Sequence, residues 1–295
     1  MADPSPLVER FEQNRARLRA IAYRMLSSLD EADDAVQQVW LQLSRSSADG
    51  VENLDAFLTT IVVRVCLNAL RARSTRREEP MGAHVPDPLI SRVDQVSPED
   101  EVLLADSVGL ALQVVLETLA PAERLAFVLH DMFDLTFDEI APMAGRTAVA
   151  TRQLASRARR RVRAADVRTP EREPDRQREA VDAYFAAAHR GDFEALLAIL
   201  DPDVVLRCDA GSAHPGLSMV LRGSEPVARR ALGTADPSVP KHPVLVNGGA
   251  GVVVMLHGQL VAVMGFTVSE RRIVEIDAIV DPERLGAIDV TAIVG

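Results

Sequence analysis

Seven arginines lie between residues 146 and 165, and this stretch contains no acidic residue. A second stretch, residues 56–77, holds five arginines and also lacks acids. Guanidinium groups bind phosphates by charge and base edges by paired hydrogen bonds, so both stretches predict contact with a nucleic acid. The chain as a whole has a net charge of −10. Such a background discourages indiscriminate binding to polyanions.

The first stretch follows the pattern of a helix-turn-helix. Thr136 and Glu139 have capping-box spacing, Gly145 suits a tight turn, and a longer helix is expected to begin near Thr147. Pro142 predicts that the shorter helix kinks or ends there. One apolar stripe of the longer helix should be buried, at Ala150, Leu154, Ala158 and Val162. The other side is predicted to contact DNA through Arg146, Thr147, Thr151, Arg152, Gln153, Ser156, Arg157, Arg159 and Arg160. The alternative interpretation is a surface helix with solvated arginines.

Two polar, proline-bearing linkers divide the chain into three predicted domains. The domains are expected at 1–80, 98–165 and 176–295, with linkers at 81–97 and 166–175. Apolar residues in the first two domains recur at helical spacing. The third domain is predicted to be α+β with an antiparallel sheet. Its β-like runs lie near 203–208, 218–222, 243–247, 251–256, 259–268 and 272–280, with a helix near 225–233.

Composition excludes several classes of protein. Hydrophobic residues make up 47% of the 295, which is enough for real cores and excludes a disordered chain. The two cysteines, Cys66 and Cys208, are too few and too far apart for a zinc ribbon or a disulfide framework. Cys66 is expected to be a core residue. No apolar signal or membrane-spanning segment is found, so a cytoplasmic protein without a bound metal or cofactor is predicted.

The third domain contains a few groups that could act as acids or bases: Asp209, His214, His257 and Asp277. Asp277 shares a strand face with Ile273 and Ile279, so it could point into a partly apolar pocket with a raised pKa. No nucleophile–base spacing and no metal-ligand cluster accompanies these groups. The sequence therefore favours a domain without catalytic activity.

Longer motifs resemble a known family. Residues 120–164, with the phrase RQLASRARRRV, resemble σ4, the −35-binding domain of extracytoplasmic-function (ECF) sigma factors. Residues 23–43 and 53–79 resemble their σ2 domain. The remainder resembles a SnoaL-like C-terminal extension, with DPERL at 281–285 where this type commonly has NPDKL. The implied fold is two all-α domains, a σ2 bundle and a σ4 helix-turn-helix, followed by an α+β cone with a curved antiparallel sheet.

The resemblance assigns roles within the first domain. It implies binding to core RNA polymerase, with σ2 on the β′ coiled coil and σ4 on the β flap. The σ2 contacts would be Asp33, Asp34, Gln37, Gln38 and Trp40. Recognition of the −10 element would involve Asn53, Arg64, Asn68, Arg71, Arg73 and Arg76. Amides and guanidinium planes suit this task because they hold unstacked bases. The sequence departs from the family pattern at Phe57, usually Trp, and at Asn68, commonly Asp.

The extension is expected to regulate the sigma domains in place of a separate anti-sigma factor. The family's WLPEP linker motif appears here as HVPDP at 84–88, and its DGGGK motif is reduced to DAGS at 209–212. The implied intramolecular contact involves Pro86, Asp87, Pro88, Asp209, Asp281, Pro282 and Leu285. Two other functions remain open: a ligand-sensing helix-turn-helix regulator and a SnoaL-like cyclase or isomerase.

Overall fold

The computed structural model describes residues 6–45, 53–75, 83–93, 109–165, 171 and 173–289. Contacts divide the described residues into two compact units. One unit contains the helices up to residue 75 together with residues 115–165, and the other contains 83–93, 109–114 and the residues from 171 onward. Within the described part of the chain, no helix is long and apolar enough to cross a membrane.

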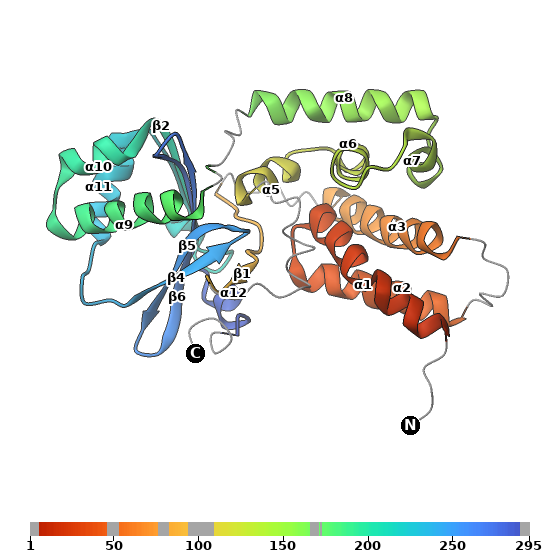
Figure 1. Ribbon diagram of the computed structural model, residues 1–295, viewed down its shortest axis with the longest axis horizontal. Helices are drawn as coiled ribbons and strands as arrows, with labels where there is room; N and C mark the ends of the chain where they lie inside the picture. The colour runs from red at the N-terminus through yellow and green to blue at the C-terminus, as the bar shows by residue number, and fades with distance from the viewer. Residues whose placement is uncertain are drawn as a thin grey trace. The chain divides into compact units, whose positions relative to one another are not determined.

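The first unit begins with three packed helices (Figure 1). They are α1 (Pro6–Leu26), α2 (Leu29–Arg45) and α3 (Leu54–Thr75). The start of α2 follows from local chemistry, because the Ser28 hydroxyl accepts a hydrogen bond from the Glu31 amide at 3.5 Å. Its apolar residues at spacings of three and four are buried against the neighbouring helices: Ala32, Val36, Val39 and Leu43.

The second part of this unit contains the expected helix-turn-helix. It begins at the end of α5 (Leu110–Glu117), whose residues 110–114 belong to the second unit. The elements that follow are α6 (Pro121–Phe127), the π-helical turn η1 (Val128–Met132), α7 (Phe137–Ala144) and α8 (Ala148–Ala164). The predicted capping box is confirmed, with Thr136 and Glu139 bonded reciprocally. Gly145 has φ +64, a conformation that glycine adopts without steric cost. Pro142 lies inside α7, and the helix continues two residues beyond it rather than ending there.

The buried face of α8 differs from the predicted stripe. Thr151, Ala155 and Ala158 are buried, whereas Leu154 and Val162 are only half-buried. The stripe at Ala150, Leu154, Ala158 and Val162 is therefore wrong at most of its positions. Small residues at 151, 155 and 158 let α8 pack closely on α6 and α7, so volume rather than hydrophobicity decided which face is buried.

A buried arginine joins the two helical parts of this unit. Arg124 on α6 is 2% exposed, and its guanidinium donates to the Arg24 carbonyl oxygen at 2.9 Å and to the Ser27 hydroxyl. Burial lowers the pKa of Arg124 to about 10, so the side chain stays charged at neutral pH. Because these bonds satisfy a charge that is out of water, α6 is anchored to the turn between α1 and α2.

The second unit is built around a seven-stranded mixed sheet with strand order β1-β4-β5-β6-β7-β2-β3. The strands are β1 (Ile90–Ser91), β2 (Leu200–Asp209), β3 (Met219–Arg222), β4 (Lys241–Val246), β5 (Gly249–Leu256), β6 (Gln259–Ser269) and β7 (Arg272–Ile279). The sheet was expected to be antiparallel, and its strand pairs are so with the exception of β2 and β7, which run parallel.

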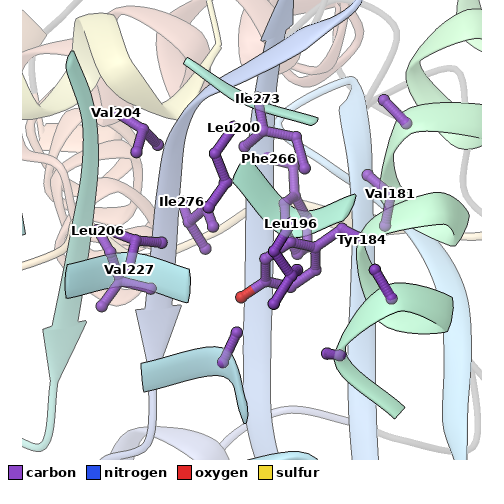
Figure 2. Packing of buried hydrophobic residues seen from close by; sticks show 14 of the residues in the cluster. Val181, Tyr184, Leu196, Leu200, Val204, Leu206, Val227, Phe266, Ile273 and Ile276 are labelled. Carbon is purple, nitrogen blue, oxygen red and sulfur yellow. The ribbon is translucent and has the colours of Figure 1, made fainter. Parts of the chain in front are cut away.

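One face of the sheet is covered by helices (Figure 1). These are α9 (Pro174–Arg190), α10 (Phe193–Ile199) and α11 (Ser224–Thr234). Tyr184 of α9, Leu196 of α10 and Val227 of α11 pack with Phe266 and Ile276 of the strands, as Figure 2 shows. This arrangement is an α+β cone, and its main apolar core lies between the helices and the sheet.

The opposite face of the sheet is covered by other segments of the same unit. Val85, Leu110 and Leu285 pack there against Val253 and Ile279 of the strands. Leu285 belongs to α12 (Pro282–Gly286), whereas Val85 comes from the predicted linker. The linker is thus an ordered part of this core over residues 83–93. It also contributes β1, which pairs with β4 at the edge of the sheet.

Candidate functional site

The exposed face of α8 gathers most of the predicted DNA contacts. The side chains that lie on it or at its N-terminal turn are Arg146, Thr147, Arg152, Gln153, Ser156, Arg157 and Arg160. The Arg152 guanidinium lies 5.3 Å from the centre of the Phe137 ring, which restrains it at the surface. Val149 was not predicted. It is 65% exposed in the first turn of α8, and its apolar side chain next to Arg152 and Gln153 is the signal that could have identified it.

Two predicted contacts on α8 are engaged elsewhere. Thr151 is fully buried, and its hydroxyl donates to the Thr147 carbonyl oxygen at 3.0 Å. Its assignment as a DNA contact is therefore wrong, because the side chain belongs to the packed face. Arg159 is half-buried, and its Nε donates to the Asp131 carboxylate at 2.7 Å, so part of its charge is already neutralised.

The residues predicted to contact the −10 element also divide into exposed side chains and side chains bonded within the protein. Arg64, Asn68 and Arg71 are exposed and recur at spacings of four and three, which places them on one face of α3. Asn53 is exposed as well, but its side-chain oxygen Oδ1 accepts the Ala56 amide at 3.0 Å and caps α3. Arg76 lies outside the described residues.

Arg73 has a structural role. Its guanidinium donates to the Leu26 carbonyl oxygen at 3.0 Å and pairs with the Glu31 carboxylate. Both partners lie at the junction of α1 and α2. The bonds therefore hold the end of α3 to that junction, and the contact of Arg73 with the −10 element stays a prediction.

The predicted polymerase contacts surround a groove between α1 and α2. The groove has a volume of about 320 Å³, and Asp33, Asp34, Gln37 and Trp40 line it together with Phe11. Trp40 is half-buried, with its ring centre 5.0 Å from that of Phe11. Each wall thus carries an aromatic ring: the α2 wall adds carboxylates and an amide, and the α1 wall adds Glu12 and Arg15. Gln38 is exposed on α2 but is not part of the groove lining.

A second candidate site, in the other unit, is the seat of the linker. Asp209 at the end of β2 is 5% exposed, and its carboxylate accepts the Val85 amide at 3.0 Å and an Arg284 guanidinium N–H at 2.8 Å. His84 Nδ1 lies 3.0 Å from the same oxygen. Arg284 also donates to the Asp87 carboxylate and the Val85 carbonyl oxygen, each at 2.7 Å. Two carboxylates and one guanidinium therefore hold residues 84–87; we call this group the Asp209 latch.

Asn247, which was not predicted, holds the linker farther along. This buried residue in the β4–β5 turn accepts the Leu89 amide on its side-chain oxygen at 3.0 Å. Its own backbone amide donates to the Leu89 carbonyl oxygen at 2.8 Å. The Asn-Gly-Gly turn in the sequence was a signal for a tight turn, but nothing in it indicated a partner 158 residues away.

The other predicted members of the linker contact have mixed roles. Pro86, Pro88 and Leu285 are buried. Asp281 is also buried, but its carboxylate caps α12 by accepting the Glu283 amide at 3.1 Å. Pro282 is exposed. His84 and Arg284, which reasoning from the sequence missed, complete the latch.

The electrostatics of the latch favour an ionised Asp209. Burial raises the pKa of this carboxyl, but hydrogen bonds from His84, Val85 and Gly211 outweigh burial and bring the pKa down to about 2. Because three donors and the Arg284 guanidinium all favour the charged form, the carboxylate is a permanent anion at neutral pH.

The four acid–base candidates of this unit do not form a site. Asp277 is 2% exposed, and burial raises its pKa, but it pairs with Arg207 on the sheet face opposite the helices. The expectation that it points into a pocket is therefore wrong. His214 and His257 are exposed outside the strands, and Asp209 belongs to the latch. Cys66, as expected, is fully buried in the first unit, and burial raises its pKa to about 12.

Comparison with known proteins finds matches that cover residues of both units. Residues 10–76 match Sigma-70 region 2, and residues 109–162 match Sigma-70, region 4. The chain is 36% identical over 249 residues to the ECF RNA polymerase sigma factor SigJ of Mycobacterium tuberculosis, covering 83% of this chain and 80% of SigJ. The chain belongs to the ECF sigma factor family. It is also 32% identical to the probable ECF sigma factor SigI of the same species, over 97% of each chain.

A crystal structure of SigJ extends this relationship to the fold. It matches this ECF sigma factor with a TM-score of 0.75 at 31% identity, covering 95% of this chain and 98% of that one. The helices α1–α3 thus form σ2, the helices from α5 to α8 form σ4, and the cone is a SnoaL-like extension present as in SigJ. As an ECF sigma factor, the chain binds core RNA polymerase and directs promoter-specific initiation of transcription.

We predict that Asp209→Asn loosens the linker. A shift of the Asp209 pKa from 3.8 to about 2 corresponds to about 2 kcal/mol, so amides of residues 83–93 should exchange about 30-fold faster with deuterium. In the wild type, the Asp209 pKa is lower in the folded state than in the unfolded state. The protection of linker amides that this carboxylate provides is therefore complete above about pH 4 and is lost as the pH falls toward 2. Glu194→Gln, an exposed carboxylate on α10, is the control. Equal exchange in both variants would contradict the prediction.

Proposed function

We propose that the exposed face of α8 reads the −35 element of the promoter. The observation that carries this is the division of α8 into a buried face of small residues and an exposed face of cations, an amide and one apolar side chain. Arg152 and Gln153 suit base edges in the major groove, and Val149 suits a thymine methyl group. Arg157 and Arg160, nearer the C-terminus, suit phosphates and set the register.

The proposed −10 surface is the face of α3 that carries Arg64, Asn68 and Arg71. Amide and guanidinium groups on one helix face can hold unstacked bases by hydrogen bonds and stacking. Asn53 at the start of the same helix extends this surface. It lies at the position where the chain enters α3, so a base bound there would also touch the helix N-terminus.

The groove between α1 and α2 is proposed as the seat of the polymerase β′ coiled coil, and σ4 as the domain that binds the β flap. Aromatic rings beside carboxylates suit a basic helix with an apolar stripe, because the stripe can pack on Trp40 while its cations meet Asp33 and Asp34. Asp33 is already paired with Arg19, with Nε to Oδ1 at 2.6 Å, so Asp34 would contribute more of the attraction.

We infer that the SnoaL-like domain acts as a built-in regulator instead of a separate anti-sigma factor. Residues 83–93 belong to the stretch that connects σ2 to σ4, and the domain holds them by the latch, by Asn247 and by β1 pairing. A linker held in this way restricts the placements of σ2 and σ4 that promoter binding requires. Release of the latch would remove that restriction.

The regulator is proposed to have no catalytic activity. Asp277, the strongest acid–base candidate in the sequence, is paired with Arg207 and buried, and His214 and His257 stand apart from it. A helix-turn-helix regulator that acts without polymerase is the rival function. It would bind promoter duplex tightly as a free protein, whereas a sigma factor needs the core enzyme.

For the −35 surface, we predict different effects from phosphate and base contacts. Arg157→Gln and Arg160→Gln should each weaken holoenzyme binding to all promoters similarly and reduce the slope of log K against log salt by about 1. Val149→Ala should abolish the preference for thymine over uracil at one −35 position. Binding of holoenzyme to labelled promoters measures both, with Arg229→Gln on α11 as the control. A change of base preference in Arg157→Gln would contradict the assignment.

For the groove between α1 and α2, we predict that the effect of a charge reversal on affinity for core polymerase depends on its position. Asp34→Lys should weaken binding to core polymerase by about 30-fold or more, because a contact residue changes sign. Asp30→Lys changes the same charge one turn earlier on α2, outside the groove lining, and should have a much smaller effect. Competition against labelled wild-type protein for core polymerase measures both. Equal losses would mean that overall charge, not the groove, governs binding.

For the regulator, we predict that weakening the latch raises promoter output. Asp209→Asn and Arg284→Gln should increase run-off transcription by up to about 30-fold, the factor by which about 2 kcal/mol shifts a two-state equilibrium. Affinity for core polymerase should stay unchanged, since the groove is untouched. Glu194→Gln is again the control, and melting temperatures show whether each variant is folded. Output equal to wild type in both latch variants would reject regulation through the linker.

A further inference from the structure

The SnoaL-like domain contains a cavity that no proposed function uses. Its volume is about 240 Å³, roughly that of eight waters at ~30 Å³ each. It lies between the sheet and the helices α9 and α11. The sheet side of its lining is mostly apolar, with Leu206, Val254, Ala262, Met264 and Ala278 in the strands and Val280 directly after β7. A space of this size and lining would accept a flat apolar body of one or two rings.

One polar side chain that lines this cavity has a hydroxyl available to a ligand. Tyr184 is 3% exposed and lines the cavity, and its hydroxyl makes no hydrogen bond to any residue that the structure describes. Its ring packs beside Phe266, with ring centres 5.7 Å apart (Figure 2). Among the described residues the hydroxyl is not a fully buried atom without a partner, so it is accessible from the cavity, where a bound group can accept its hydrogen bond. Burial raises the pKa of Tyr184 and Arg230 lowers it, so the phenol remains a neutral donor near a cation.

The rim of the cavity is cationic. Arg230 of α11 has no ion-pair partner in the described part of the chain. Lys241 lies 5.8 Å from the centre of the Phe185 ring and donates only to backbone carbonyl oxygens, of Asp236 at 2.9 Å and Val239 at 3.1 Å. The one carboxylate of the lining, that of Asp236, accepts from the amide and the hydroxyl of Ser238. Burial lowers the pKa of His189, which leaves the imidazole neutral.

We propose that this cavity binds a small aryl carboxylate, with its ring against the sheet and its carboxylate between the Tyr184 hydroxyl and Arg230. The apolar lining and the two aromatic side chains of α9 supply the surface for the ring. The unpartnered donor and the unpaired guanidinium supply two bonds that a carboxylate can accept, which a purely apolar ligand would leave unmade. The proposal concerns the extension alone and does not depend on the sigma function.

The test measures binding of the probe 2-naphthoate to the full chain by isothermal titration calorimetry. We expect saturable one-to-one binding, and at least tenfold weaker binding of the neutral isostere 2-naphthamide. Arg230→Gln should weaken 2-naphthoate about tenfold, and Tyr184→Phe a few-fold, without altering the amide. Tyr184→Phe keeps the ring and removes a hydroxyl that has no partner, so it should not disturb the fold.

Arg229→Gln provides the matched control, because Arg229 is the adjacent arginine on α11 but pairs with Glu225 and does not line the cavity. It should leave 2-naphthoate binding unchanged. The proposal is overturned if 2-naphthoate does not bind saturably at millimolar concentration, or if acid and amide bind equally. It is also overturned if Arg230→Gln and Tyr184→Phe bind the acid as the wild type does, since the probe would then lie elsewhere.

Discussion

The Asp209 carboxylate is the interaction on which the second unit depends. It is almost inaccessible to water, and its charge is compensated by an amide of the linker and by Arg284, which in turn holds Asp87. A buried carboxylate without such donors would destabilise the fold by several kcal/mol. The linker is therefore needed for the stability of the extension as well as for connecting σ2 to σ4. The proposed regulation would therefore act on the same bonds that stabilise the extension.

In the first unit, Arg124 is likewise a buried charge that is stabilised by hydrogen bonds to another part of the chain. This guanidinium is withdrawn from water and satisfied by the Arg24 carbonyl and the Ser27 hydroxyl, both at the α1–α2 turn. Separating a surface ion pair would cost little free energy. The buried Arg124 cation, in contrast, must find new hydrogen-bond acceptors or solvent before α6 can leave α1. Any rearrangement of σ4 relative to σ2 on polymerase has to expose Arg124 to water. The position of α6 against the α1–α2 turn is thus held by a defined polar contact as well as by apolar packing.

Local patterns in the sequence predicted much of the fold. Capping at Thr136, the turn at Gly145 and the helices of σ2 depend on residues close in sequence, and these predictions hold. Thr151 was misassigned because its chemistry suits DNA while its side chain lies on the packed face of α8. The distant partners of Arg73 were likewise not visible in the sequence. Asn247 and Arg284 were missed for the same reason: their partners in the linker lie 158 and 197 residues away. Periodicity shows which face a residue occupies but not what lies opposite it.

The two-residue strand β1 has a further consequence for the extension. It covers the outer edge of β4, while Val85 covers apolar residues on the adjoining face. Uncovered strand edges are templates for pairing with other chains, and natural sheets protect them. When the linker leaves, β4 becomes such an edge beside a patch of exposed valines. An activated sigma factor would then be prone to self-association until the transcription complex engages it, so the released state would be short-lived in the free protein.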